Sequence, residues 1–158
     1  MTQPRQTTTL PRRIWQWLER HPLRLKLLLG AYWLAMFTGT HVPPIHTGVS
    51  KNHRDKLMHF GAYFGLAILL AAARSLRGRL GPPQYLTTLL ILSGYGVVDE
   101  FLQQFVSRDP DPLDWLADTV GAALGLAVWA LLSRQLQLTA ADQETAVAAA
   151  VGRADSRE

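Results

Sequence analysis

The stretch VDEFLQQFVSRDPDPLDWLADTVG, residues 98–121, decides the fold of this chain. It is preceded by the apolar run LTTLLILSGYGV and followed by the apolar run AALGLAVWALL. Pro110 and Pro112 lie between the two runs and discourage one continuous helix. The pattern therefore predicts two helices with a short connection, which makes them antiparallel neighbours whose acidic ends lie side by side.

Apolar stretches extend this pattern over most of the chain, which has 158 residues, 48% of them hydrophobic, and no cysteine. They cover residues 24–42, 57–76, 84–106 and 115–132. A membrane-spanning helix needs about 20 mostly apolar residues. A soluble bundle would carry polar residues at every turn of an outer face, and residues 66–73 and 121–132 carry none. We therefore predict an all-α integral membrane bundle of four transmembrane helices.

The net charge of +4 does not indicate nucleic-acid binding, because the basic residues are divided among the segments between the apolar stretches. Cytoplasmic loops of membrane proteins are enriched in Lys and Arg. One side of the predicted bundle holds Arg5, Arg12, Arg13, Arg20, Arg24, Lys26, Arg74, Arg77, Arg79 and Arg134, and the other holds Lys51, Arg54, Lys56 and Arg108. We therefore predict that both termini are cytoplasmic, with loops 43–55 and 107–113 outside.

The bundle divides the chain into three parts. Residues 1–23 form a cytoplasmic segment with a short amphipathic helix at the membrane interface, since Ile14, Trp15, Trp17 and Leu18 lie among charged residues. The first apolar stretch has the basic flank of a signal peptide, but no A-x-A-like site follows it, so we interpret it as a retained helix. Residues 24–133 form the transmembrane domain. Residues 134–158 form a polar tail that is either a weak helix or flexible and disordered.

Polar side chains gather at one end of three predicted helices. Residues three, four and seven apart share a helix face, and ionisable groups at membrane depth nearly always face protein or water. The third helix presents Ser93, Gly96, Glu100, Gln103 and Gln104, with Asp99 at the edge of that face; the fourth presents Asp114 and Asp118; and the second presents Lys56, His59 and Tyr63, with Asp55 one turn before His59. These residues predict an outward-facing polar pocket at the membrane surface. Gly121 and Gly125 form a G-x-x-x-G spacing, which predicts close helix packing.

The same residues resemble the VanZ-like family. The resemblance covers residues 25–132 and rests on Asp55, Lys56, His59, Tyr63, Glu100, Gln103, Arg108, Asp114, Gly121 and Gly125. Ser107 stands where the family often has Gly, and Asp118 where it often has Asn, which adds a carboxylate to the pocket. The resemblance implies a small multi-pass protein of the bacterial inner membrane. The namesake of the family is associated with low-level resistance to the glycopeptide teicoplanin, by a mechanism that is not established.

Structural interpretations compete with the functional ones at several positions. Glu100 and Arg108 could form an ion pair that closes the helix hairpin, and Asp114 could cap its helix. His59 could be a packed histidine bonded to Asp55 or Tyr63. The histidines in or near the first outer loop, His41, His46 and His53, lack the H-x-x-x-H spacing of a zinc motif. We predict neither a metal nor a cofactor.

The pattern favours a binding protein that recognises the polar headgroup of a lipid-linked cell-wall precursor or a glycopeptide antibiotic. Its predicted binding residues are Lys56, His59, Tyr63, Asp99, Glu100, Gln103, Arg108, Asp114 and Asp118. An enzyme on a lipid-borne substrate is the first alternative, with Glu100 or Asp114 as base, His59 as proton shuttle and Arg108 stabilising charge. A structural or assembly role is the second alternative. The expected partner is the lipid bilayer, and the sequence does not decide whether the chain forms a homo-oligomer.

Overall fold

The computed structural model describes residues 10–41, 51–106 and 110–155. Within these ranges the chain is helical and contains no strand. The elements are α1 (Leu10–Arg20), α2 (Pro22–His41), α3 (Lys51–Ser75), α4 (Pro82–Gln103), the 3-10 helix η1 (Gln104–Val106) and α5 (Pro112–Asp155). The all-helical prediction is confirmed for the described residues, and most of each apolar stretch lies in one of the elements α2 to α5, with the third stretch continuing into η1.

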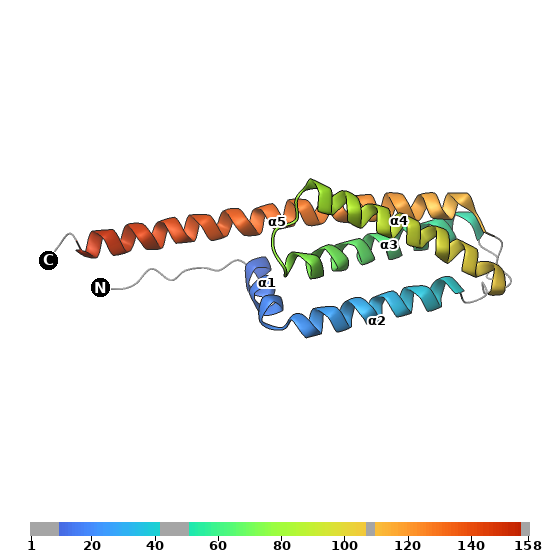
Figure 1. The fold of residues 1–158 in the computed structure, drawn as a ribbon, viewed down its shortest axis with the longest axis horizontal. Coiled ribbons are helices and arrows are strands. Elements are labelled where there is room, and N and C mark those ends of the chain that lie inside the picture. The colour runs from blue at the N-terminus through green and yellow to red at the C-terminus, as the bar shows by residue number, and fades with distance from the viewer. Residues whose placement is uncertain (1–9, 42–50, 107–109, 156–158) are drawn as a thin grey trace.

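Helices α2 to α5 run up and down beside one another (Figure 1). The end of α2, the start of α3, the end of α4 and the start of α5 therefore meet at one end of the bundle, while α1 and the last turns of α5 lie toward the other. Helix α1 lies across that second end, where the ring centroids of Trp15 and Trp129 are 5.4 Å apart. Helix α5 continues beyond the bundle without interruption to Asp155.

The turn between α3 and α4 has a local cause. Gly78 adopts a φ of 133°, a conformation that a residue with a side chain rarely adopts. Pro82 and Pro83 then begin α4, where the missing N–H of proline costs no helical hydrogen bond. The side chain of Gln84 accepts a hydrogen bond from the N–H of Gly81 at 3.0 Å and so closes the first turn.

Helices α3 and α5 make the most extensive contact in the bundle. Glycines on successive turns of α5 allow it, because a Cβ atom at Gly121 would overlap the carbonyl of Phe60, and one at Gly125 would overlap the carbonyl of Phe64. The two backbones therefore approach one another with no side chain between them. This contact sets the positions of α3 and α5 on which the polar end of the bundle depends.

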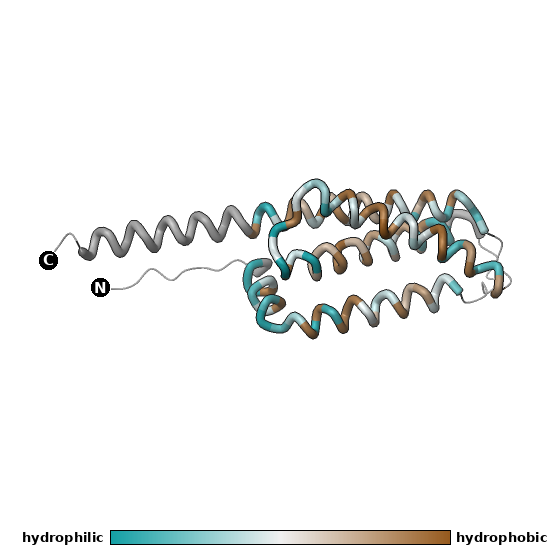
Figure 2. The backbone as a smooth tube through the Cα atoms, viewed as in Figure 1, coloured by the Kyte–Doolittle hydropathy of each residue, from teal (hydrophilic) through white to brown (hydrophobic). Residues whose placement is uncertain are grey.

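The outer surface of the bundle is apolar and much of its interior is polar. Large apolar side chains such as Leu27, Leu90 and Leu131 are exposed, whereas His59 and Asp118 are buried. Along the helices, apolar residues gather in the middle of the bundle and hydrophilic residues are more frequent at its two ends (Figure 2). Large exposed apolar surfaces are unfavourable in water and are the expected surface of a protein in lipid.

Three helical segments are long and apolar enough to cross a membrane, namely Arg54–Ser75, Pro82–Val106 and Pro112–Leu136. Helix α2 is not among them; its 20 residues include Arg24 and Lys26. The described residues therefore support a membrane protein with three candidate spans. The fourth span and the orientation of the termini stay predictions.

Candidate functional site

The polar cluster lies where α2, α3, α4 and α5 meet at one end of the bundle. Each helix contributes side chains from the turns nearest to that end. The cluster consists of Thr40 and His41 from α2, Asp55, Lys56, His59 and Tyr63 from α3, Asp99, Glu100 and Gln103 from α4, Asp111 just before α5, and Asp114 and Asp118 within α5. Eight of the nine predicted binding residues therefore lie together.

Arg108, the ninth predicted binding residue, lies outside the described residues, and so does the ion pair with Glu100 that the sequence suggested. Ser107 also lies outside them.

His59 and Asp118 form the centre of the cluster. The Nδ1 atom of His59 is 3.0 Å from Oδ1 of Asp118 and 3.9 Å from Oε1 of Glu100. Because an ionised carboxylate only accepts hydrogen bonds, Nδ1 of His59 donates to Asp118. The absence of a side chain at Gly96 leaves room for this carboxylate, since a Cβ there would lie 3.3 Å from Oδ2 of Asp118. His59 is packed in the interior, as the sequence suggested, but its partner is Asp118 rather than Asp55 or Tyr63.

Lys56 joins α3 to the start of α5. Its Nζ atom donates to Oδ2 of Asp111 at 2.6 Å and to Oδ1 of Asp114 at 2.8 Å. The hydrogen bond from Lys56 lowers the pKa of Asp111 below its usual value. Lys56 is therefore held as a counter-ion of two carboxylates, and its charge is already compensated within the cluster.

Asp111 also begins α5. Its Oδ1 atom accepts a hydrogen bond from the N–H of Leu113 at 2.9 Å, and Pro112 occupies the first helical position. Asp followed by Pro is a favourable start for a helix, because the carboxylate caps a free N–H and proline lacks one. The suggestion that Asp114 caps this helix is wrong, since Asp114 lies within its first turn.

Glu100 holds the connection between α4 and α5. Its Oε2 atom accepts the backbone N–H of Asp111 at 2.9 Å, and its Oε1 atom accepts Nε2 of Gln103 at 3.3 Å. Hydrogen bonds to a charged acceptor contribute about 1.5–3 kcal/mol. Glu100 thus fixes the start of α5 against the end of α4, which brings Asp114 and Asp118 into the cluster.

Asp99 links the cluster to α2. Its Oδ1 atom accepts a hydrogen bond from Oγ1 of Thr40 at 3.3 Å, and Nδ1 of His41 lies 3.8 Å away. The predicted polar face of α4 is wrong at two residues. Asp99 was expected at the edge of that face but is fully buried, and Gln104 was expected within the face but is exposed. Gln104 leaves the face because α4 ends at Gln103 and Gln104 begins the tighter helix η1.

Thr40, His41 and Asp111 were not among the predicted binding residues. The Asp111–Pro112 pair is a recognisable helix start, and it was the available signal for Asp111. No local pattern marks Thr40 or His41, because their place in the cluster depends on how α2 packs against α4.

Several buried polar atoms of this region have no hydrogen-bond partner among the described residues. They are Nε2 of His59, Nε2 of His41, the hydroxyls of Tyr63 and Tyr95, Oδ2 of Asp99 and Oδ2 of Asp118. A buried polar atom without a partner costs about 1–3 kcal/mol. Such atoms are rare in folded proteins and call for a water, an ion or a ligand.

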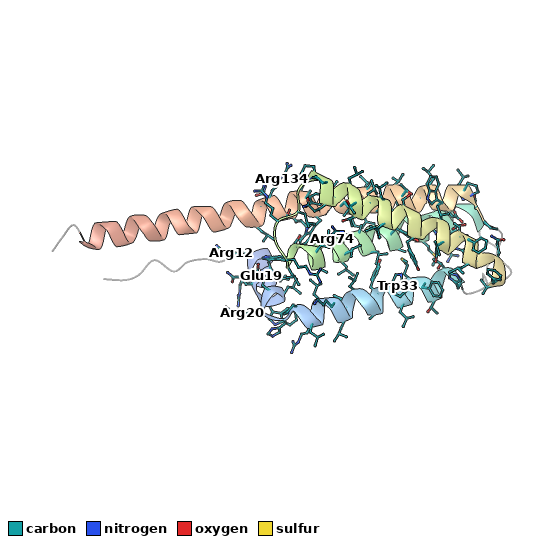
Figure 3. The ribbon with its side chains drawn as sticks, in the orientation of Figure 1. Arg12, Glu19, Arg20, Trp33, Arg74 and Arg134 are labelled. Atoms are coloured by element: carbon teal, nitrogen blue, oxygen red, sulfur yellow. The ribbon has the colours of Figure 1, made fainter. Side chains whose placement is uncertain are left out.

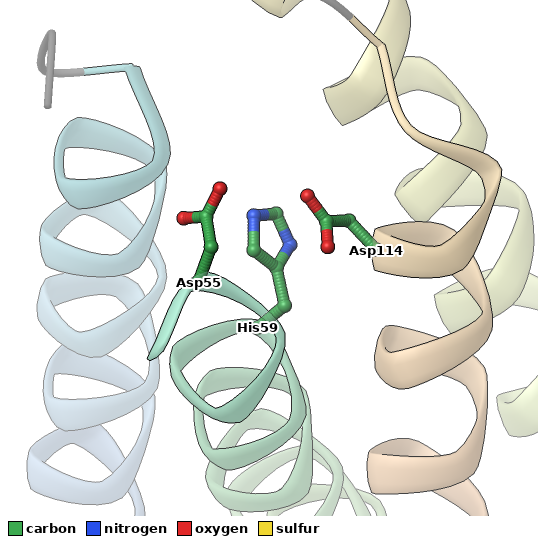
Figure 4. A group of neighbouring side chains, drawn as sticks. All are labelled: Asp55, His59 and Asp114. Carbon is green, nitrogen blue, oxygen red and sulfur yellow. The ribbon is translucent and has the colours of Figure 1, made fainter. Parts of the chain in front are cut away.

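Two overlapping groups in the cluster have the composition of a metal site. They are Asp55, His59 and Asp114, and His59, Glu100 and Asp118, with one potential ligand atom from each residue lying within 4.8 Å of the others. The first group is drawn in Figure 4, where the His59 ring lies between the two carboxylates. A separate cavity of about 260 Å³ lies at the opposite end of the bundle, lined in part by Trp15, Arg79 and Trp129.

The model of the VanZ/LLP1 family matches residues 8–133. The match spans α1 to α4 and the part of α5 that packs in the bundle. No curated protein matches the chain, and no solved structure does.

Proposed function

The chain belongs to the VanZ/LLP1 family, and on this premise we propose that it is a bacterial inner-membrane protein with four spans and both termini in the cytoplasm. Helix α2 is the fourth span, because it lies alongside the bundle and exposes Leu27, Leu28 and Leu34. Arg12, Arg20, Arg74 and Arg134 lie toward the end opposite to the polar cluster (Figure 3). The excess of basic residues at that end supports a cytoplasmic position for it and an outer position for the cluster.

This topology gives the three parts of the chain their roles. Residues 1–23 include α1, whose position across the end of the bundle supports a place at the cytoplasmic membrane interface. Residues 24–133 are the transmembrane domain. In residues 134–158, α5 continues to Asp155, and this topology places that part of the helix in the cytoplasm.

The polar cluster binds the headgroup of a cell-envelope molecule, such as a lipid-linked cell-wall precursor or a glycopeptide. The observation that carries this proposal is the set of buried polar atoms without partners, which a ligand can satisfy. The cluster holds one lysine and six carboxylates, of which those of Asp99, Glu100, Asp114 and Asp118 are buried. Since Lys56 is engaged by two of the acids of the cluster, the cluster favours ligands that donate hydrogen bonds, namely amines, amides and sugar hydroxyls.

Native mass spectrometry of the full chain, released directly from bacterial membranes, tests this function. We expect a bound lipid or glycan on the wild-type protein and its loss from Glu100→Gln and Tyr63→Phe. The second change is the sharper one, because the Tyr63 hydroxyl has no partner among the described residues and its removal leaves the fold intact.

Tyr32→Phe is the matched control. It removes a hydroxyl that donates to the carbonyl of Ala62 at 3.0 Å, outside the cluster, so it lowers stability and leaves the ligand bound. A ligand that persists on both Glu100→Gln and Tyr63→Phe would show that the cluster is only structural.

A second function, an enzyme acting on a lipid-borne substrate, is favoured by the bond between His59 and Asp118. A buried carboxylate that orients a histidine is a common arrangement for proton transfer. The two functions differ in whether the bound molecule is converted. To separate them, the co-purified molecule is incubated with wild-type protein and with Asp118→Asn, and the products are identified by mass spectrometry. Conversion by the wild type and not by Asp118→Asn would show that the protein is an enzyme; no conversion would support binding alone.

A further inference from the structure

The ring of His59 has one nitrogen that is bonded and one that is available. Nδ1 lies 3.0 Å from Oδ1 of Asp118, and in a neutral ring that donates this hydrogen bond Nε2 is an unprotonated acceptor. His59 is only 1% exposed, and Nε2 has no hydrogen-bond partner among the described residues. A buried acceptor of this kind requires a donor or a cation.

Two carboxylates flank the same ring. Asp55 precedes His59 by one turn of α3, and Asp114 faces it from the first turn of α5 (Figure 4). One potential ligand atom of each of the three residues lies within 4.8 Å of the others. Ligand atoms at about 2.1 Å from a tetrahedral ion are about 3.4 Å apart, so small side-chain rotations bring these three atoms to bonding distance.

We propose that His59, Asp55 and Asp114 hold a divalent transition-metal ion of the Zn²⁺ or Mn²⁺ class, with Asp118 as the positioning residue of His59. Imidazole and carboxylate are ligands that such ions accept. A metal-bound histidine almost always donates its other ring N–H to a carboxylate, which fixes its tautomer and its orientation. The His59–Asp118 bond meets this condition, and the two ligand carboxylates match the charge of the ion.

Lys56 is the natural competitor of the metal. Its ammonium group lies 2.8 Å from Oδ1 of Asp114 and so occupies one of the ligand carboxylates. A positive charge that close repels a divalent cation. The metal site is therefore stronger when this lysine is removed, whereas a purely structural ion pair would only be weakened by the same change.

Titration calorimetry of the full chain in nanodiscs of zwitterionic lipid, with Zn²⁺ and separately with Mn²⁺, tests the site. We expect one ion per chain for the wild type. Asp55→Asn and His59→Gln should abolish binding, and Lys56→Gln should tighten it by about 10-fold. Glu19→Gln is the matched control, since it removes a carboxylate of α1 at the opposite end of the bundle and should leave one ion bound (Figure 3).

Asp118→Asn tests the positioning role. Loss of the outer carboxylate should weaken the affinity by about 10–100-fold, while the visible absorption of bound Co²⁺, which reports the ligand set, stays unchanged. Helical circular dichroism shows whether each variant is folded. If His59→Gln does not fold, Asp55→Asn tests the metal site by itself, because the side chain of Asp55 is only half-buried.

Two results would overturn the inference. The first is the absence of saturable binding to the folded wild-type protein. The second is loss of the ion from Glu100→Gln together with its retention by Asp55→Asn, which would place the ion on the other side of the ring. The site lies in the cluster to which we assign headgroup binding, but the metal alone is the probe here, so a failure of this inference leaves the mass-spectrometric test of headgroup binding unaffected.

Discussion

Replacement of Gly121 by alanine should force α3 and α5 apart and disturb the polar cluster. The added Cβ overlaps the backbone carbonyl of Phe60, which cannot rotate aside. Ordinary van der Waals contact is restored when the two backbones separate by about 1 Å. His59 adjoins Phe60 in the chain, and Asp118 lies one turn before Gly121, so the same shift stretches their 3.0 Å hydrogen bond to about 4 Å, beyond the range of such bonds.

The energetic cost follows from the kind of atom that is overlapped. Overpacking costs about 1–3 kcal/mol, and a rigid backbone contact belongs to the upper part of that range, about 2–3 kcal/mol. Alanine regains up to about 1 kcal/mol of helix propensity relative to glycine. We therefore expect Gly121→Ala to lower the free energy of unfolding by about 1–2 kcal/mol.

Gly94→Ala is the matched control, because no atom lies within 4 Å of a Cβ at that position of α4. It should be neutral or stabilising by up to about 1 kcal/mol. Reversible unfolding in mixed micelles titrated with sodium dodecyl sulfate measures both variants, and the ¹⁵N shift of His59 Nδ1 reports its bond to Asp118. If Gly121→Ala proves as stable as Gly94→Ala with the His59 shift unchanged, the close contact of α3 with α5 does not exist as described.

Two further predictions concern the ends of the bundle. With the polar cluster outside, Pro110→Cys should react with an impermeant maleimide on intact cells and Gly78→Cys should not; labelling of Gly78→Cys alone would invert the topology. The hydrogen bond from Lys56 lowers the pKa of Asp111. The ionised Asp111 therefore stabilises the fold above the usual carboxyl pKa of about 3.9, and this stabilisation is lost as the pH falls through the lowered pKa. Asp111→Asn should therefore unfold at a lower temperature than the wild type at pH 7, with a difference that shrinks in acid; a difference that does not depend on pH would contradict this reasoning.

The fold and the gathering of the acids could be predicted from the chain alone. The apolar stretches mark helices because only a helix satisfies its own backbone in lipid. The positions of the acids within those stretches place them at one end, because antiparallel helices with short connections alternate in direction. That is why the position of His59, Glu100 and Asp114 at a common end needed no structure.

The partners of these residues needed the tertiary structure. Sequence spacing places residues on one face of one helix, but it contains nothing about how two helices are rotated and shifted against each other. The glycine contact between α3 and α5 sets that rotation, so His59 bonds Asp118 across the interface rather than Asp55 or Tyr63 on its own helix. The packing of α2 likewise brings Thr40 to Asp99, which lies 59 residues away in the chain. Pairing is decided by distances between helices, and those distances exist only once the side chains of the whole bundle have packed.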